Sequence, residues 1–336
     1  MKFIFSAILS FFAFFIQAQE TPTTVETPKV DYAQLVPQKK SLLWKIEGND
    51  LKETSYLFGT IHMIPSNSFF WPPNTKEAVA KCERMTFEIN MDDMTNFGSQ
   101  LSIMMNLFMK NGVTLPKLLS KEDYQLVRDH FETINMPLPA FMIDKIKPMF
   151  LSIMATTDMD MMGGGLMGGD DEDDSDDESE GIKSYEMEFM ELANESDMLM
   201  DGLETVEFQM SMFDSIPYQA QAEMLVDAVK TAQDSTLSQD GSIDELVKLY
   251  KQQDLQALQQ TIQDESAGVE QFEELLLVKR NKNWIPIMEK QMADKATFFA
   301  VGAGHLGGEK GVIALLRAQG YTLTAASQEE LSPQEN

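Results

Sequence analysis

The sequence predicts a single-domain α+β fold in which a central mixed β-sheet is flanked by many helices. Strand-like segments occur near both ends of the chain, and the long middle part has helical periodicity. Two distant segments, 56–63 and 299–306, also share one plan: an apolar strand ends at Gly, two residues pass, and His and an apolar residue follow. This repeated Gly-x-x-His turn predicts two related strand ends brought together in one sheet.

The first half of the domain contains a predicted hairpin and then helices. Two apolar strands, 42–46 and 55–58, are separated by the turn residues 48–50. A short helix at 75–82 and a strand at 85–89 follow, and 95–155 has a helical, Met-rich pattern. Ser120 and Asp123 resemble a capping box that opens a helix running through Ile134.

The second half is predicted to be mostly helical from 184 to 292. Ser242 with Glu245 reads as a capping box, and Pro286 is expected to kink or restart the last long helix. The chain then returns to the sheet, with a strand, a helix and a final strand at 297–301, 311–319 and 321–324.

The ends of the chain carry segments that do not read as part of the domain. Residues 1–18 combine Lys2, an apolar run and small residues near Ala18, which is typical of a secretory signal peptide cleaved after Ala18. An uncleaved N-terminal anchor is the alternative. We expect an exported protein, periplasmic or secreted, with no stable membrane span after signal removal. The expected organisation is a flexible leader at 19–40, a domain at 41–327 interrupted by a disordered Gly/acidic loop at 163–181, and a disordered tail at 328–336.

Composition excludes several classes of function. The 336 residues include 26 Lys and Arg against 54 Asp and Glu, a formal net charge of −28, so no nucleic-acid partner is expected. Cys82 is the single cysteine, which rules out an intrachain disulfide and a Cys-based zinc cluster. Histidine chemistry must come from His62, His130 or His305.

Two of these histidines, His62 and His305, occupy the repeated Gly-x-x-His turns, and Glu88 lies at the end of another predicted strand. Two imidazoles and one carboxylate are a usual ligand set for a metal ion that activates water. Each histidine could instead only satisfy backbone groups beside a tight turn. His130 lies among apolar residues at helical spacing, so we expect it to be a packing residue.

The sequence resembles the TraB/GumN family, which includes the Tiki proteases, over about residues 42–324. The matching pieces are Leu57-Phe58-Gly59-Thr60-Ile61-His62, Phe87-Glu88-Ile89, Gly202-Leu203-Glu204-Thr205-Val206-Glu207 with Gln209, Arg280-Asn281 with Trp284, and Val301-Gly302-Ala303-Gly304-His305-Leu306-Gly307-Gly308. The resemblance implies a fold like that of the ChaN and erythromycin-esterase proteins. It also implies a site for Mn²⁺ or Co²⁺ and peptidase activity.

The same resemblance assigns candidate site residues. His62, His305 and Glu88 become the metal and water-activating set, with Glu88 either a ligand or the general base. Arg280 could hold a substrate carboxylate and Asn281 could donate to a developing oxyanion, or both could be structural. Glu204 could orient a histidine or end a helix. Many relatives carry an Asp where this chain has Ser184-Tyr185-Glu186, which leaves a third carboxylate ligand open.

The expected function is an exported metal-dependent hydrolase, most simply a peptidase with a peptide or protein substrate. The alternative is a non-catalytic protein of the same fold that binds a metal, haem or a peptide. A third reading is Cu(I) binding by the Met-rich stretch before the acidic run, which includes Met154 and Met167. The sequence does not set the oligomeric state.

Overall fold

The computed structural model describes residues 30–90, 97–134, 136, 138–156, 181–233, 239–265 and 274–326. The expected signal peptide, nearly all of the Gly/acidic loop, and the tail lie outside these residues, as does the first half of the leader, 19–29. The Met-rich stretch beyond Thr156 lies outside them as well.

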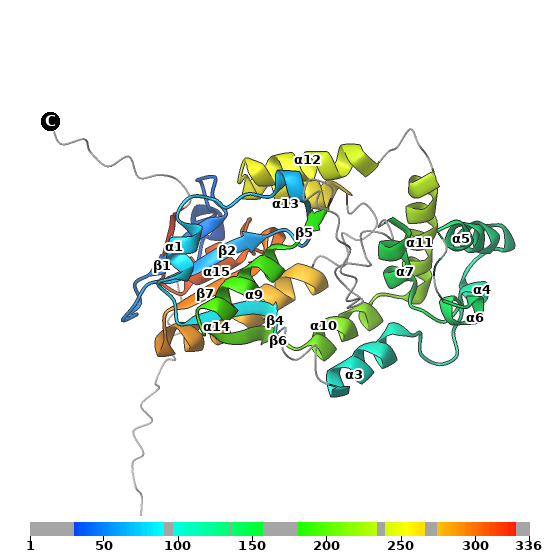
Figure 1. Cartoon of the computed structure of the whole chain (residues 1–336), viewed down its shortest axis with the longest axis horizontal. Coiled ribbons are helices and arrows are strands. Elements are labelled where there is room, and N and C mark those ends of the chain that lie inside the picture. Colours follow the sequence, from blue (N-terminus) through cyan, green and yellow to red (C-terminus); the bar gives the residue numbers. More distant parts are fainter. Residues whose placement is uncertain are drawn as a thin grey trace, which may run out of the picture. The chain divides into compact units, whose positions relative to one another are not determined.

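A six-stranded mixed sheet forms the centre of the fold, which confirms the predicted α+β class (Figure 1). Its order is β6-β4-β7-β2-β1-β8. The strands are β1 (Leu43–Glu47), β2 (Ser55–Thr60), β4 (Arg84–Ile89), β6 (Leu199–Glu204), β7 (Thr297–Gly302) and β8 (Thr322–Ala325). The run β6-β4-β7-β2 is parallel, whereas β1 is antiparallel to both of its neighbours. A separate two-stranded sheet joins β3 (Ile64–Pro65) to β5 (Ile182–Lys183).

The register of β2 and β7 brings the two Gly-x-x-His turns to one edge of the sheet. Gly59 pairs with Val301 and Thr60 with Gly302, so both strands end at the same level. Gly59 is required by close approach, because a Cβ there would lie 3.1 Å from the Cα of Ala303 in the second turn. The two motifs are therefore packed directly against each other.

Helices account for most of the remaining described chain. They are α1 (Thr75–Val79), α3 (Phe97–Leu107), α4 (Leu115–Leu118), α5 (Lys121–Thr133), α6 (Ala140–Ile143), α7 (Pro148–Thr156), α9 (Tyr185–Glu195), α10 (Val206–Met212), α11 (Tyr218–Gln233), α12 (Gln239–Lys251), α13 (Leu255–Glu265), α14 (Lys279–Asp294) and α15 (Val312–Ala318). Shorter turns are η1 (Tyr32–Leu35), η2 (Ser66–Ser68), η3 (Phe213–Ser215), the π-helical η5 (Glu274–Val278) and η6 (Ala303–His305). As predicted, Ser120 caps α5 by accepting the backbone N–H of Asp123 at 3.0 Å.

The sheet has helices on both faces (Figure 1). On one face Phe58 of β2 packs on Phe189 of α9, with ring centroids 5.0 Å apart. On the other face Thr86 of β4 donates to Gln291 of α14 at 3.0 Å. Every residue of β2 is buried, as expected for a parallel strand covered on both sides. A second apolar cluster joins residues of α5, α7 and α11.

Two local predictions were wrong, and the expected restart of the last long helix at Pro286 does not occur. Residues 199–204 form strand β6, because pairing with β4 decides the conformation of a segment that lacks a clear strand pattern. Helix α12 begins at Gln239, so Ser242 lies inside it. Pro286 lies within α14, where burial of Trp284 and Met288 on the sheet side keeps the helix continuous despite the lost N–H donor.

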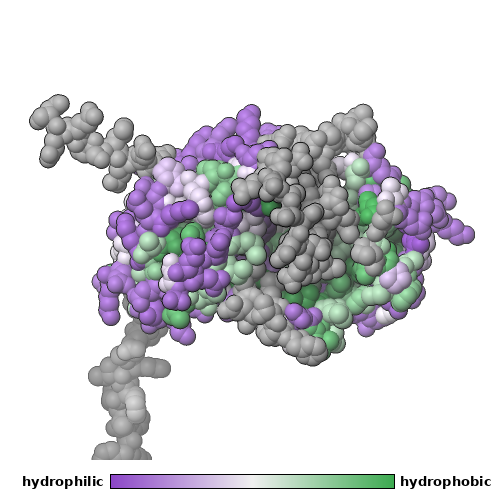
Figure 2. Space-filling model, in the orientation of Figure 1, coloured by the Kyte–Doolittle hydropathy of each residue, from purple (hydrophilic) through white to green (hydrophobic). Residues whose placement is uncertain are grey.

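The surface is mainly hydrophilic over the sheet, and apolar residues gather over α3 (Figure 2). On that helix Leu101, Met104 and Met105 are 46%, 61% and 68% exposed. Among the described residues, no helix combines the length and the apolar character that crossing a bilayer requires.

Phe58→Ala should lower the free energy of unfolding by about 3–5 kcal/mol, because it leaves a cavity among the aromatic rings between β2 and α9. Phe141→Ala is the matched control, since Phe141 is 63% exposed. Urea unfolding followed by tryptophan fluorescence measures both variants. Equal effects of the two substitutions would contradict the packing described here.

Candidate functional site

A cavity of about 450 Å³ opens at the carboxyl edge of the parallel strands, where β2, β7 and β4 end. Its polar side contains His62, Glu88, Gln209, Arg280 and His305. These side chains come from two strand ends, the turn after β7, α10 and α14, which lie far apart in the sequence. Four of the five predicted site residues therefore line one cavity, and the fifth, Asn281, contacts His305.

His305 is buried and held from both ring nitrogens. Its Nδ1 lies 2.6 Å from the side-chain oxygen of Asn281, and its Nε2 lies 3.1 Å from Nη1 of Arg280. Arg280 can only donate, so Nε2 is the acceptor and Nδ1 carries the proton. Burial, aided by the charge of Arg280, lowers the pKa of His305 to about 4. The imidazole is therefore neutral at physiological pH, with a fixed tautomer.

Arg280 is the centre of the polar network. Its Nη2 donates to Glu88 at 2.5 Å and to Glu204 at 2.6 Å, and its Nε donates to Glu204 at 2.9 Å. Burial disfavours the charge on Arg280, but the two glutamates more than compensate and raise its pKa. Trp284 completes the arrangement by donating Nε1–H to Glu204 at 3.1 Å and stacking its ring 4.9 Å from the guanidinium. Glu204 thus orients Arg280, not a histidine.

Both carboxylate oxygens of Glu88 are engaged. Oε1 accepts the backbone N–H of Gly302 at 2.9 Å and lies 3.6 Å from Nε2 of His305, while Oε2 accepts from Arg280. A side chain at Gly302 would crowd this carboxylate, because a Cβ there would lie 3.2 Å from Oε1. Burial alone would raise the pKa of Glu88, but His305, Arg280 and the Gly302 N–H lower it to about 2.

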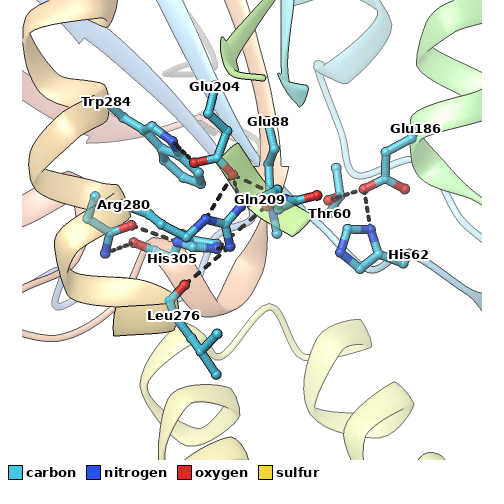
Figure 3. A network of polar contacts seen from close by, with 12 residues as sticks. Thr60, His62, Glu88, Glu186, Glu204, Gln209, Leu276, Arg280, Trp284 and His305 are labelled. Atoms are coloured by element: carbon cyan, nitrogen blue, oxygen red, sulfur yellow. Dashed lines mark hydrogen bonds and ion pairs between the residues drawn. The ribbon is translucent and has the colours of Figure 1, made fainter. Parts of the chain in front are cut away.

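His62 forms a separate pair with Glu186, at the start of α9 (Figure 3). Nδ1 of His62 lies 2.9 Å from Oε1 of Glu186, which also accepts the hydroxyl of Thr60 at 2.6 Å. Ser184 donates to Oε2 at 2.9 Å. The hydrogen bond with Glu186 raises the pKa of His62 to about 9, although its side chain is 70% exposed.

The sequence left open whether a third carboxylate belongs to the site, and the structure places Glu186 beside His62. Glu186 belongs to the stretch Ser184-Tyr185-Glu186, for which the resemblance left a third carboxylate ligand open. In the sequence, Glu186 is visible only as an acidic residue in the first turn of a predicted helix. Nothing in the sequence indicates that it contacts His62. His130, by contrast, lies in the second apolar cluster, where its Nε2 contacts the carbonyl of Ala155 at 3.0 Å.

The imidazole and carboxylate donors that face the cavity suit a divalent metal ion in type. Within the described ranges, however, no three His, Cys, Asp or Glu side chains are already grouped as a metal site. Instead, His62 is hydrogen-bonded to Glu186, and the guanidinium of Arg280 lies between His305 and the two glutamates, Glu88 and Glu204.

Most of the domain matches a known protein family. Residues 42–325 match the model of the TraB/PrgY/gumN family. The chain belongs to this family. Both Gly-x-x-His turns, Glu88 and the Arg280-Asn281 pair lie inside the matched range.

Curated relatives of this TraB/PrgY/gumN protein include proteins named as metalloproteases. It is 23% identical to Metalloprotease TIKI1 of Homo sapiens, covering 89% of this chain and 65% of the human protein. It is 22% identical to Metalloprotease TIKI1 of Danio rerio and 23% identical to Metalloprotease TIKI2 of Xenopus tropicalis, covering 84% of this chain in each case. The chain spans 59–65% of the length of these relatives. No solved structure shows a significant match.

In the metal-free protein, His62 should titrate near pH 9 and Glu186→Gln should move its pKa down toward the ordinary 6.5. Because the folded pKa is raised, the pair stabilises the protein fully below about pH 6.5, and this contribution is lost as pH rises through about 9. NMR titration of the imidazole protons measures the shift. A wild-type pKa at or below 6.5 would contradict the His62–Glu186 pair.

Arg280→Met should lower the free energy of unfolding by about 3–5 kcal/mol, because it leaves Glu88 and Glu204 buried without their cation. Arg128→Met is the control, since Arg128 pairs with an exposed Glu132 one helical turn away and should cost about 0.5 kcal/mol. Urea midpoints of both variants measure the difference. Equal losses would show that Arg280 does not hold a buried network.

Proposed function

We propose that this protein is an exported metal-dependent hydrolase that cleaves peptide bonds, with Mn²⁺ or Co²⁺ as its metal. One observation carries the proposal: His62, Glu88 and His305 face a single cavity above three neighbouring strands. Membership of a family whose matched relatives are named metalloproteases supports the same chemistry.

The metal would be held by His62, His305 and Glu88, with Glu186 as a further carboxylate beside His62. A divalent ion bound by such ligands lowers the pKa of its water to about 7 and so supplies hydroxide at neutral pH. The tautomer of His305 supports this role, because Nδ1–H donates to Asn281 and the Nε2 lone pair is directed toward Arg280 and Glu88. Fixing a ligand in this way is what partners behind a metal-binding histidine do.

The structure favours positioning roles for Arg280 and Asn281 over direct contact with substrate. The guanidinium of Arg280 is fully used by Glu88, Glu204, His305 and the carbonyl of Leu276. Asn281 uses its amide on His305 and on the carbonyl of Lys310, at 2.9 Å for the latter. We therefore propose that these residues set the orientation and charge of His305 and Glu88.

The binding-protein alternative has one supporting observation. Arg280 already neutralises much of the carboxylate charge that would attract a metal ion. A binding protein of this kind would bind and release a metal ion, haem or a peptide without changing it chemically. Export is proposed on the N-terminal 18 residues alone, and cell fractionation with N-terminal sequencing of the mature protein tests it.

His62→Ala, His305→Ala and Glu88→Gln should each remove more than about 99% of Mn²⁺- or Co²⁺-dependent cleavage of a peptide library, because each removes one proposed ligand. His130→Gln is the matched control and should keep activity, since His130 lies in the helical cluster away from the cavity. Mass spectrometry of the products and calorimetry with both ions are the measurements.

Full turnover by any of the three site variants would overturn the proposed mechanism. Metal or peptide binding by the wild-type protein without any cleavage would instead establish the binding-protein alternative.

A further inference from the structure

The lining of the cavity above the strands is polar in part and apolar in part. Beside the polar network it includes six apolar side chains, which we call the apolar wall: Ile61, Met212, Phe213, Leu246, Leu258 and Leu276. These residues come from the turn after β2 and from α10, η3, α12, α13 and η5. Ile61, Phe213, Leu246 and Leu276 remain half-buried and keep part of their apolar surface at the cavity. Apolar surface gathered in a concave site is typical of a pocket that takes an apolar group.

The polar side offers little to a charged substrate side chain. Arg280 and Gln209 both donate to Glu88 and Glu204, and Nε2 of His305 accepts from Arg280. Two glutamates face one arginine, so this part of the network carries a net negative charge. An acidic side chain placed against the apolar wall would meet hydrocarbon there and the net negative charge around Glu88 and Glu204. His62, which also lines the cavity, is already hydrogen-bonded to Glu186. The acidic side chain would lose its hydration without gaining a partner.

We propose that the apolar wall is a specificity subsite that accepts a large apolar side chain, such as Leu, Met or Phe, flanking the peptide bond that is cut. Cleavage beside the bound side chain rests on the proposed peptidase function, whereas the binding preference for an apolar side chain rests on the cavity alone. The volume of about 450 Å³ exceeds what a single water or ion needs and falls within the range of small-ligand pockets.

Helix α12 fixes this wall to the sheet. Tyr250 is buried and donates its hydroxyl to the carbonyl of Gly59 at 2.8 Å, so α12 is tied to the first Gly-x-x-His turn. Leu246 precedes Tyr250 by four residues and therefore lies on the same side of the helix, facing the cavity. Leu246 and Leu249 are both half-buried on α12 and both pack against the apolar core, but of the two only Leu246 lines the cavity.

The test uses fluorescent peptides that are identical except for Leu, Ala or Glu at one central position. Their affinity for the full metal-free protein is measured by anisotropy, and their cleavage with Mn²⁺ or Co²⁺ by mass spectrometry. The Leu peptide should bind about 10-fold or more tightly than the Ala peptide, and the Glu peptide most weakly. Leu246→Lys should remove the preference for Leu, because it places an ammonium group in the wall. Leu249→Lys is the matched control and should keep the preference.

Each result decides the inference separately from the proposed function. A preference for Leu in binding, lost in Leu246→Lys but kept in Leu249→Lys, supports the subsite even if no peptide is cut, in which case the peptidase proposal fails. Cleavage that ignores the central residue, with equal binding of all three peptides, overturns the subsite and leaves the peptidase proposal standing. Equal binding without cleavage overturns both. Preference lost equally in both variants also overturns the assignment to Leu246.

Discussion

The buried ion pairs of Arg280 are the interaction on which the candidate site depends. One guanidinium joins Glu88 at the end of β4, Glu204 at the end of β6 and His305 in the turn after β7. Burying these charges separately would be very unfavourable, so the three elements and α14 must come together as a set. The tautomer of His305 and the ionised state of Glu88 both follow from this arrangement.

The two Gly-x-x-His turns differ in structure although their sequences share one plan. Phe58 and Thr60 of β2 lie on the face covered by α9. Glu186 of α9 accepts from Thr60 and also from His62, which follows the strand. His305 is held instead by Asn281 and Arg280 of α14, which covers the opposite face. One histidine is exposed and has a raised pKa, whereas the other is buried and has a lowered pKa. The cavity lies where the two environments meet, and we propose that a metal would join them there.

The sequence correctly predicted the elements whose local residue pattern is typical of only one kind of secondary structure. Alternating apolar residues and turn residues predicted the hairpin of β1 and β2, and Ser120 predicted the start of α5. The prediction failed where pairing with a distant strand overrides the secondary-structure preference of the segment itself. Leu199–Glu204 has no strong strand pattern, yet it completes the parallel sheet beside β4 and carries Glu204 into the site. Glu186 was noticed only as a departure from relatives, because its contact with His62 spans 124 positions of the chain.

The sequence by itself determined the fold class and the candidates His62 and His305, because few histidines and one repeated turn leave little choice, with Glu88 at the end of a third strand. Arg280 and Asn281 became candidates only through the resemblance to the TraB/GumN family. The sequence could not assign partners to these residues. Only the tertiary structure decided that Arg280 serves two glutamates, that Asn281 fixes His305, and that Glu186 pairs with His62. The reason is physical: hydrogen bonds and ion pairs act over about 3 Å, and folding alone sets which distant residues come that close.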